Sequence, residues 1–374
     1  MQFKRVVIVG FLILSLFAVW DVTRPAPGGF AGIVTREYVR LDGERVRFPV
    51  REPDYAEERA LEPVTGVRAL AIESVSGILE LVPSETGAVT ASYTVLLWAD
   101  GNPARLAETG AAIARQVTAT WVREGDSARL TVNRPAQLPA GVQAMRVAVR
   151  VAVPDGVAVT ARHTGAALVE GLTGAVRLEH RSGDVVVRRV AGPVDITSGF
   201  AVIDVLGVEG ALNAQLLGGD LKVRDVTGTV QGRVRMGALE LARVAGDVTF
   251  TVDRGRARVE NVGGNLHLNT SYGQVEIARV AGDIRLEHSF GEADVRDVTR
   301  AADISVRFGE LEVALSGEGG WNVEAMAEMG SLETDLPLRR EASELRTVVS
   351  GVIGDGAHDV RLQVHQGALR LTRR

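Results

Sequence analysis

The sequence of 374 residues contains no cysteine, which excludes disulfides, thiolate metal sites, a cysteine nucleophile and a lipid-modified cysteine. Aromatic residues make up only 5% of the chain, which suits a thin core that Val, Leu and Ala fill better than rings. Lysine occurs only at Lys4 and Lys222, and no stretch is densely basic. With a net charge of −5, the chain lacks the electrostatic footprint of a nucleic-acid-binding protein, so we expect no nucleic-acid partner.

One apolar run lies near the N-terminus, from Val6 to Trp20, after the basic pair Lys4 and Arg5. This order is typical of an export signal. The run is short for a membrane span, yet Leu16, Phe17 and Ala18 at its end make a poor cleavage site. We therefore interpret residues 1–24 as a signal or anchor segment, favouring an uncleaved anchor over a secreted chain. Residues 25–66 are expected to be a linker, and the bulk of the chain to lie in the cell envelope outside the cytoplasm.

Residues 155–316 consist of one 18-residue unit repeated nine times. Valine recurs once in every unit from Val190 to Val298, with glycine two places later in most units. A second glycine row, from Gly165 to Gly309, lies half a unit away. Each unit, numbered 1 to 18 from residues 173, 191, 209 and onwards, therefore contains two half-units, each a glycine turn followed by a strand.

Positions 4, 6, 13 and 15 of the unit are apolar in most repeats, and polar residues stand between them. This period of two predicts strands with one dry face. A single unit cannot fold alone, because about five inward side chains at roughly 1.5–3 kcal/mol do not offset the ordering of 18 residues at about 1.5 kcal/mol each. Stacking places residue i about 4.8 Å from residue i+18. The prediction is an all-β fold, a parallel β-solenoid of 18-residue, two-strand rungs.

Outward positions support this register, because Lys222, Glu240 and Arg258 alternate in sign at position 14. The repeat first appears at residues 67–84, and residues 85–153 then change period. Helical spacing after Asn102 and Pro103 predicts a small α/β insertion that caps the first rung. Beyond 316 we expect a rung at 320–337, an excursion at 338–356 and a final rung at 357–374, so that the solenoid covers 67–374.

The motifs of this region resemble the bacterial putative-adhesin β-strand-repeat proteins, also called toast-rack-like. The resemblance rests on the entry Val153-Pro154-Asp155-Gly156, on corners such as Ser182-Gly183-Asp184, and on a closing strand pair around Gly367. It implies an extracytoplasmic, membrane-tethered β-repeat domain with an adhesin-like role and no catalytic motif. The corner at Gly199 to Ala201 departs from the pattern, and a local bulge is expected there.

No catalytic, cofactor or metal residues are predicted. His180 and His288 share position 8 but lie six rungs apart, about 29 Å, so they cannot share a metal, and we interpret the histidines as structural. The many carboxylates predict a solvated face rather than a glycosidase pair. Charged residues at position 12, such as Asp184, argue against hexapeptide acyltransferase coils, and single Gly-Asp corners argue against calcium nonapeptide repeats.

Position 10 carries the main candidate contact residues, because Tyr272, Phe290 and Phe308 stand there in consecutive rungs, with Phe200 and Met236 in earlier ones. Parity with the inward positions 4, 6 and 8 favours side chains that plug the core beside the turn. The alternative is an exposed aromatic strip that contacts a sugar or another partner.

Together these features predict a non-enzymatic binding or scaffold module of the cell envelope, held to the membrane by its N-terminal segment. Its expected partners are a glycan, a cell-wall component or a protein. One rival is a carbohydrate-active β-helix enzyme, which requires a groove with converging Asp, Arg or Lys. The other is a scaffold that assembles end to end, which requires an uncapped terminal rung.

Overall fold

The computed structural model describes residues 36–41, 44–49, 53–74, 77–99, 103–135, 137–317 and 320–373. The predicted anchor at 1–24 lies outside the described residues. Within them, no helix combines the length and apolar character that a membrane span needs. The chain forms two compact units, one from Met1–Glu58, Thr94–Gln116 and Pro135–Ala148, the other from Arg59–Tyr93, Val117–Arg134 and Val149–Arg374.

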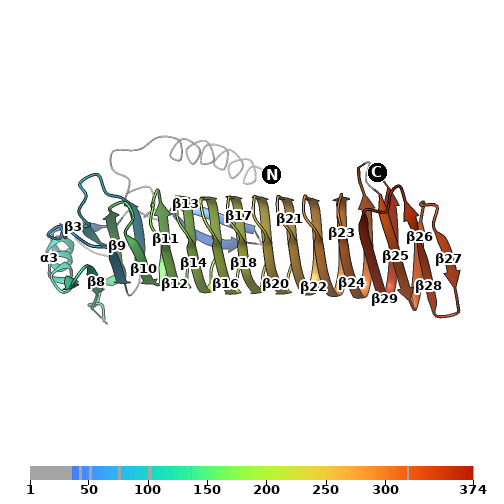
Figure 1. Ribbon diagram of the computed structural model, residues 1–374. Helices are drawn as coiled ribbons and strands as arrows, with labels where there is room; N and C mark the ends of the chain where they lie inside the picture. Colours follow the sequence, from blue (N-terminus) through green and yellow to red (C-terminus); the bar gives the residue numbers. More distant parts are fainter. Residues whose placement is uncertain are drawn as a thin grey trace. The chain divides into compact units, whose positions relative to one another are not determined.

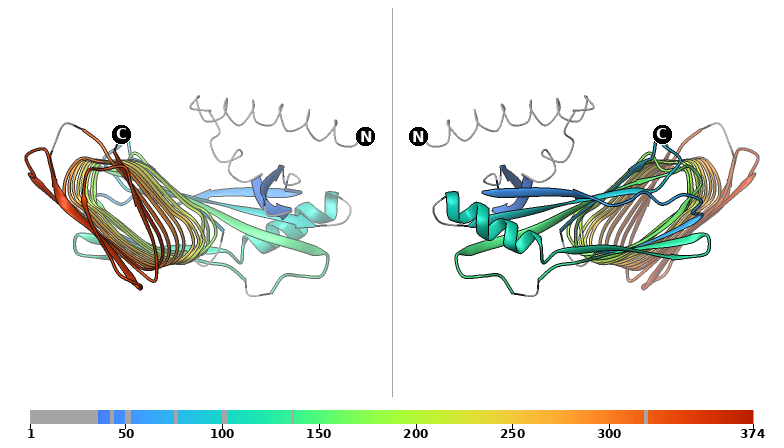
Figure 2. Two further views of the ribbon diagram at one scale, coloured as in Figure 1. Left: turned by 90° about the vertical axis from the view of Figure 1, so that its right-hand side faces the viewer. Right: turned by 90° about the vertical axis from the view of Figure 1, so that its left-hand side faces the viewer.

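The second unit is the predicted parallel β-solenoid, and its strands stack in rows (Figure 1) around a flattened tube (Figure 2). Val226 pairs with Val244 and Val244 with Val262, each one full repeat further along the chain. The rungs contain β10 (Ala158–His163), β11 (Gly165–Glu170), β12 (Val176–Ser182), β13 (Val185–Val190), β14 (Val194–Phe200), β15 (Ile203–Val208), β16 (Leu212–Gly218), β17 (Leu221–Val226), β18 (Val230–Met236), β19 (Leu239–Val244), β20 (Val248–Arg254), β21 (Ala257–Val262), β22 (Leu266–Val280), β23 (Ile284–Val298) and β24 (Ala302–Leu315).

The core consists of the inward positions that the period of two predicts, together with position 18 of each unit. Positions 15 and 18 both point inward, although an even alternation would put them on opposite faces, as at Val223 and Val226. The residue at position 17 makes this possible by taking a left-handed conformation, as in a β-bulge. The φ angle is 60° at Asp225, 56° at Arg243 and 56° at Asn261, a conformation uncommon outside glycine. Nothing in the sequence pattern indicated this column of left-handed residues.

Charge pairs between rungs follow the predicted alternation. The Lys222 ammonium lies 3.4 Å from the Glu240 carboxylate, and Arg258 lies 3.6 Å from Glu276. At position 17, Arg243 donates to Asp225 at 2.6 Å. These side chains are largely exposed and screened by water, so the pairs add little to stability and serve mainly to favour one register.

The 18-residue spacing is not kept throughout the first of the nine rungs. Val159 in β10 pairs with Val176, one position short of a full repeat, whereas Leu168 in β11 pairs with Val186, a full repeat away. The turn between the two strands absorbs the missing residue. As a result His163 lies directly beside His180.

The opening rung consists of β4 (Ala69–Ser74) and β5 (Gly77–Pro83), which pair in parallel with β10 and β11. On its other side β4 pairs with β8 (Ser127–Asn133), the second strand of a hairpin with β7 (Thr118–Glu124). The insertion therefore covers the edge of the first rung. Its other strands are β6 (Thr90–Ala99) and β9 (Val142–Val153), both of which pass from one unit into the other.

The first unit holds the predicted helix, α3 (Pro103–Ala114). Gly110 is required there, because a Cβ would overlap the ring of Tyr55. Arg146 lies over the ring of Trp98, 5.7 Å from its centroid. The predicted linker contains strands: β1 (Arg36–Leu41) and β2 (Glu44–Pro49) form an antiparallel hairpin, and β3 (Tyr55–Ala60) follows.

The expectation that the last rungs stack in chain order is wrong. The C-terminal strand β29 (His358–Arg373) pairs with β24 on one side and with β25 (Trp321–Glu328) and β26 (Gly330–Thr334) on the other. The final rung in sequence is thus the penultimate rung in space. The excursion forms β27 (Arg339–Ala342) and β28 (Arg346–Ile353), and β28 pairs antiparallel with β25, which closes this end (Figure 1).

Candidate binding surface

The aromatic column at position 10 lies on the surface, so the interpretation that these side chains plug the core is wrong. Tyr272 is 49% exposed, Phe290 37% and Phe308 38%. The parity argument fails because the chain turns a corner after position 8, where Thr270 and His288 are still buried. The glycine at position 11 is left-handed, with φ of 126° at Gly273, so the backbone changes direction between the two inward runs.

The three rings stack on one another along the solenoid. Tyr272 and Phe290 have centroids 4.8 Å apart and planes 4° apart, and Phe290 and Phe308 have centroids 4.8 Å apart and planes 7° apart. The spacing equals that of neighbouring strands, about 4.8 Å. Both faces of Phe290 are therefore covered by rings, and its edge faces solvent. Sugar stacking needs ring faces, whereas ring edges suit contact with other apolar groups.

Exposed apolar side chains extend this column in both directions. Phe200 lies over Gly218, where a Cβ would stand 2.7 Å from its ring, and Leu217 is the exposed large apolar residue of that rung. At the other end, Gln366 follows Phe308 in space, and Met329 stands in the next rung beside Gly330, which pairs with Gly367. The Met329 amide donates to the Leu345 carbonyl at 2.7 Å. We define the apolar edge by its exposed members: Phe200, Leu217, Met236, Tyr272, Phe290, Phe308, Met329 and Leu345.

The apolar edge holds eight of the eleven large hydrophobic side chains that are exposed in the described part of the chain. Such a gathering marks an interaction surface, because scattered exposure would need no explanation. The 18-residue pattern does not predict Met329 and Leu345 as exposed members of this edge, because the C-terminal rungs stack in an exchanged order. It does not predict Leu217 because this residue stands at position 9, beside a glycine at position 10.

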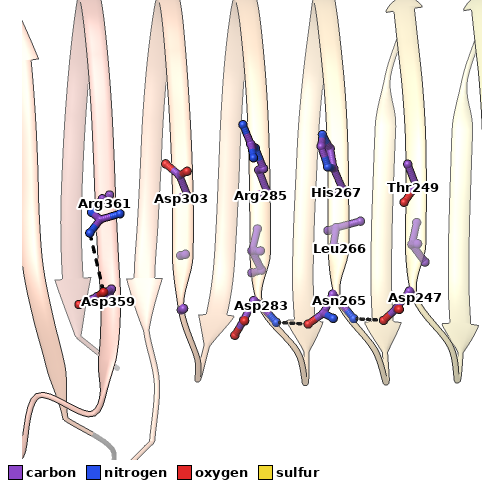
Figure 3. Close-up of a pocket in the computed structure, with 14 residues that line it drawn as sticks. Asp247, Thr249, Asn265, Leu266, His267, Asp283, Arg285, Asp303, Asp359 and Arg361 are labelled. Atoms are coloured by element: carbon purple, nitrogen blue, oxygen red, sulfur yellow. Dashed lines mark hydrogen bonds and ion pairs between the residues drawn. The ribbon is translucent and has the colours of Figure 1, made fainter.

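A polar groove of about 460 Å³ runs across the rungs on an outer face (Figure 3). Position 3 forms one rim. The Asp247 carboxylate accepts a hydrogen bond from the backbone N–H of Asn265 at 2.7 Å, and the Asn265 side-chain oxygen accepts one from the backbone N–H of Asp283 at 2.9 Å. Position 5 forms the other rim with Thr249, His267, Arg285, Asp303 and Arg361. Within the described residues, no group of three or more His, Asp or Glu side chains is placed to hold a metal ion.

The arginines of the groove are engaged with neighbours on their own strands. Arg285 lies 3.3 Å from Glu287, and Arg361 lies 3.8 Å from Asp359. The position 3 side chains, in turn, bind backbone amides of the next rung. The groove thus brings Asp and Arg together, as the enzyme hypothesis requires, but ties most of them into the solenoid itself.

The histidines at position 8 are buried, and the register slip brings two of them together. The rings of His163 and His180 have centroids 6.1 Å apart. The His163 ring donates to the Ala166 carbonyl at 3.0 Å, and that of His180 to the Gly165 carbonyl at 2.6 Å. Burial, and secondarily the nearby His180, lowers the pKa of His163 to about 4. Burial also lowers the pKa of His180 and of His288, whose ring is bonded to the Thr270 hydroxyl at 2.6 Å.

Comparison with solved structures finds proteins that align over most of their length but with low sequence identity and low TM-scores. A putative cell adhesion protein from Clostridium sporogenes is 9% identical, with 86% of this chain and 99% of that chain covered and a TM-score of 0.21. A putative lipid binding protein from Parabacteroides distasonis is 10% identical, with 85% and 96% covered and a TM-score of 0.31. A comparison with curated proteins found no match.

The sequence profile of one family, Toastrack DUF4097, matches residues 173–372. This range holds most of the 18-residue rungs and the exchanged C-terminal strands. Because the match covers more than half of the 374 residues, the chain belongs to the Toastrack DUF4097 family.

Proposed function

We propose that the chain is a non-enzymatic binding module of the bacterial cell envelope, and that it contacts its partner along the apolar edge. The observation that carries this proposal is the line of exposed rings at Tyr272, Phe290 and Phe308, stacked at 4.8 Å. A row of exposed apolar side chains on a solenoid has an energetic cost in water unless a partner covers it. The exposed ring edges favour an apolar protein surface over a glycan.

The solenoid supplies rigidity, because each rung is hydrogen-bonded to both neighbours along its full length. A partner that contacts several rungs therefore meets a surface that is ordered before binding, which lowers the entropic cost of association. The envelope location is supported by the basic and apolar order of residues 4–20, which is typical of an export signal. In this proposal the N-terminal segment tethers the solenoid to the membrane.

The rival enzymatic function finds one supporting observation, the groove that contains Asp283, Arg285 and Asp303. We favour a non-enzymatic role because the Arg285 side chain is paired with Glu287 and the position 3 side chains bind backbone amides. Release of reducing ends from envelope polysaccharides by the wild type, and its loss in Asp303→Asn, would establish the rival function instead. We expect no release from either protein.

End-to-end assembly is disfavoured by the closing hairpin. The terminal strand β27 exposes Arg339, Arg340 and Glu341, and charged edge strands resist pairing with another chain. At the other end of the solenoid, β8 covers β4. Neither end of the solenoid therefore presents an uncovered rung with which another copy could pair.

Capture from a detergent-solubilised envelope extract tests the proposed function. The bait is the full chain, compared with the edge variant Tyr272→Ala, Phe290→Ala, Phe308→Ala. A matched control on the groove, His267→Ala, Arg285→Ala, Asp303→Ala, removes three exposed side chains from three rungs as well. We expect the wild type and the groove variant to retain the same envelope component and the edge variant to lose it. Equal capture by all three proteins would refute the apolar edge as the binding surface.

A further inference from the structure

Two columns of charge flank the apolar edge, and their signs reverse along it. On one side, position 12 reads Arg256, Gln274, Glu292 and Glu310 in successive rungs. On the other side, position 9 reads Asp253, Ser271, Ser289 and Arg307. The middle of both columns falls between the rungs of Tyr272 and Phe290, within the stack of rings.

This pattern is its own complement under a two-fold rotation. In a symmetric pair of identical chains, residue i of one copy meets residue j of the other and the reverse. An antiparallel pair with its axis between the rungs of Tyr272 and Phe290 places Arg256 opposite Glu310. The same rotation places Asp253 opposite Arg307 on the other flank. One register of the two copies therefore pairs opposite charges in both flanking columns.

The apolar centre is complementary in the same register. Tyr272 of one copy meets Phe290 of the other, and Arg254, which interrupts the apolar edge, meets Phe308. The exposed edge of the Phe308 ring can pack against the aliphatic part of the Arg254 side chain while the guanidinium stays in water. We propose, building on the apolar edge as the binding surface, that its partner is a second copy of this chain in an antiparallel two-fold pair centred between Tyr272 and Phe290.

Two flanking charges, Arg307 at position 9 and Glu310 at position 12, are available for such a pair. Arg307 and Glu310 are exposed, and within the described residues neither has an ion pair or side-chain hydrogen bond. Arg256 is bonded to Gln274 at 3.3 Å, and Gln274 to Glu292 at 3.0 Å, which holds this column in place. The contact between Arg256 and Glu310 therefore carries the test.

The contact between Asp253 and Arg307 is the weaker of the two flanks. Arg233 donates to the Asp253 carboxylate at 2.7 Å within the same chain, so Arg307 of a second copy would share that carboxylate. A parallel pair is disfavoured on a different ground. It would put Arg254 of each copy against Arg254 of the other at the centre of the apolar edge.

Charge reversal distinguishes the two arrangements. In the antiparallel pair, Arg256→Glu places a carboxylate opposite Glu310, and Glu310→Arg places a guanidinium opposite Arg256. Each variant alone should dissociate at least tenfold more readily than the wild type. In an equimolar mixture of the two, each mixed pair has opposite charges at both of its contacts between positions 256 and 310, so it should pair more tightly than either variant alone. In a parallel arrangement, where Arg256 faces Asp253 and Glu310 faces Arg307, mixing restores nothing.

The experiment is sedimentation velocity on the full chain in detergent over a concentration series. We expect the wild type to pass from monomer to dimer, both single variants to stay monomeric, and their mixture to form the dimer. The edge variant, which keeps the N-terminal segment, reports whether that segment alone causes association. A wild type that is monomeric throughout, or a mixture that stays monomeric, would overturn the inference. A monomeric wild type whose capture still depends on the edge would refute the dimer and leave the proposed function standing. A dimer whose capture of the envelope component is unaffected by the edge variant would support the dimer and refute the proposed function.

Discussion

Gly273 lies directly against Gly255 of the preceding rung, and a Cβ on Gly273 would overlap the Gly255 carbonyl oxygen deep within van der Waals contact. The same relationship links Gly291 to Gly273 and Gly309 to Gly291. This glycine column is what lets the corner under the stacked rings keep the close spacing of the strands. It joins the sequence repeat directly to the geometry of the apolar edge.

Gly273→Ala should destabilise the solenoid by at least about 2 kcal/mol, because the left-handed φ of 126° and the overlap with Gly255 both oppose a side chain. The measurement is the midpoint of thermal unfolding followed by circular dichroism. Gln274→Ala, an exposed neighbour at the same corner, should change stability by no more than about 0.5 kcal/mol. An unchanged midpoint for Gly273→Ala would mean that the rungs are not this close.

Phe250 fills space that Gly232 leaves in the rung before it. The two residues pair across the strands, and a Cβ on Gly232 would stand 2.8 Å from the Phe250 ring. Phe250→Ala should cost about 3–5 kcal/mol through the cavity it creates. Thr249→Ala, one residue earlier and outward, serves as the control in chemical unfolding. Similar losses for the two variants would contradict the inward placement of Phe250.

The buried histidines predict that stability falls with acid. The unfolded chain protonates His163 near pH 6.5, whereas the folded chain protonates it near 4, so the unfolded state binds more protons between these values. Stability is therefore full above pH 6.5 and falls by up to about 3 kcal/mol as pH drops to 4. His180 and His288 act in the same direction.

Unfolding midpoints from pH 7.5 to 4 provide the test for His163. His163→Gln should flatten the pH dependence relative to the wild type. A His163 variant with the slope of the wild type would show that this ring is not the titrating group.

The exchanged order of the last rungs predicts an unusual response to truncation. Deleting residues 357–374 removes β29 and leaves β24, β25 and β26 without their parallel partner. Deleting residues 318–374 exposes only β24. The shorter chain should therefore stay more soluble than the longer one, as measured by light scattering during refolding. Rungs stacked in chain order would give the opposite ranking.

The period of 18 predicted the rungs, their register and most of the core, because a stacked column forces every unit to repeat the same inward positions. It did not predict the exposure of Phe290, since alternation holds only along a straight strand and the chain turns before position 10. It also missed the pairing of His163 with His180, which depends on one residue lost within a turn. It did not predict the place of β29 between β24 and β25, because a repeat pattern shows which residues face inward but not which rung stacks on which.

Hydroxyl-radical footprinting of the chain in cells that produce it, compared with the purified protein in dilute solution, tests directly whether a partner covers the apolar edge. Met236, Met329, Tyr272 and Phe290 oxidise readily when exposed, and Val122, exposed elsewhere, provides the reference. We expect several-fold protection of the four edge residues in cells, with unchanged labelling of Val122. Equal labelling of the edge in both samples would contradict it.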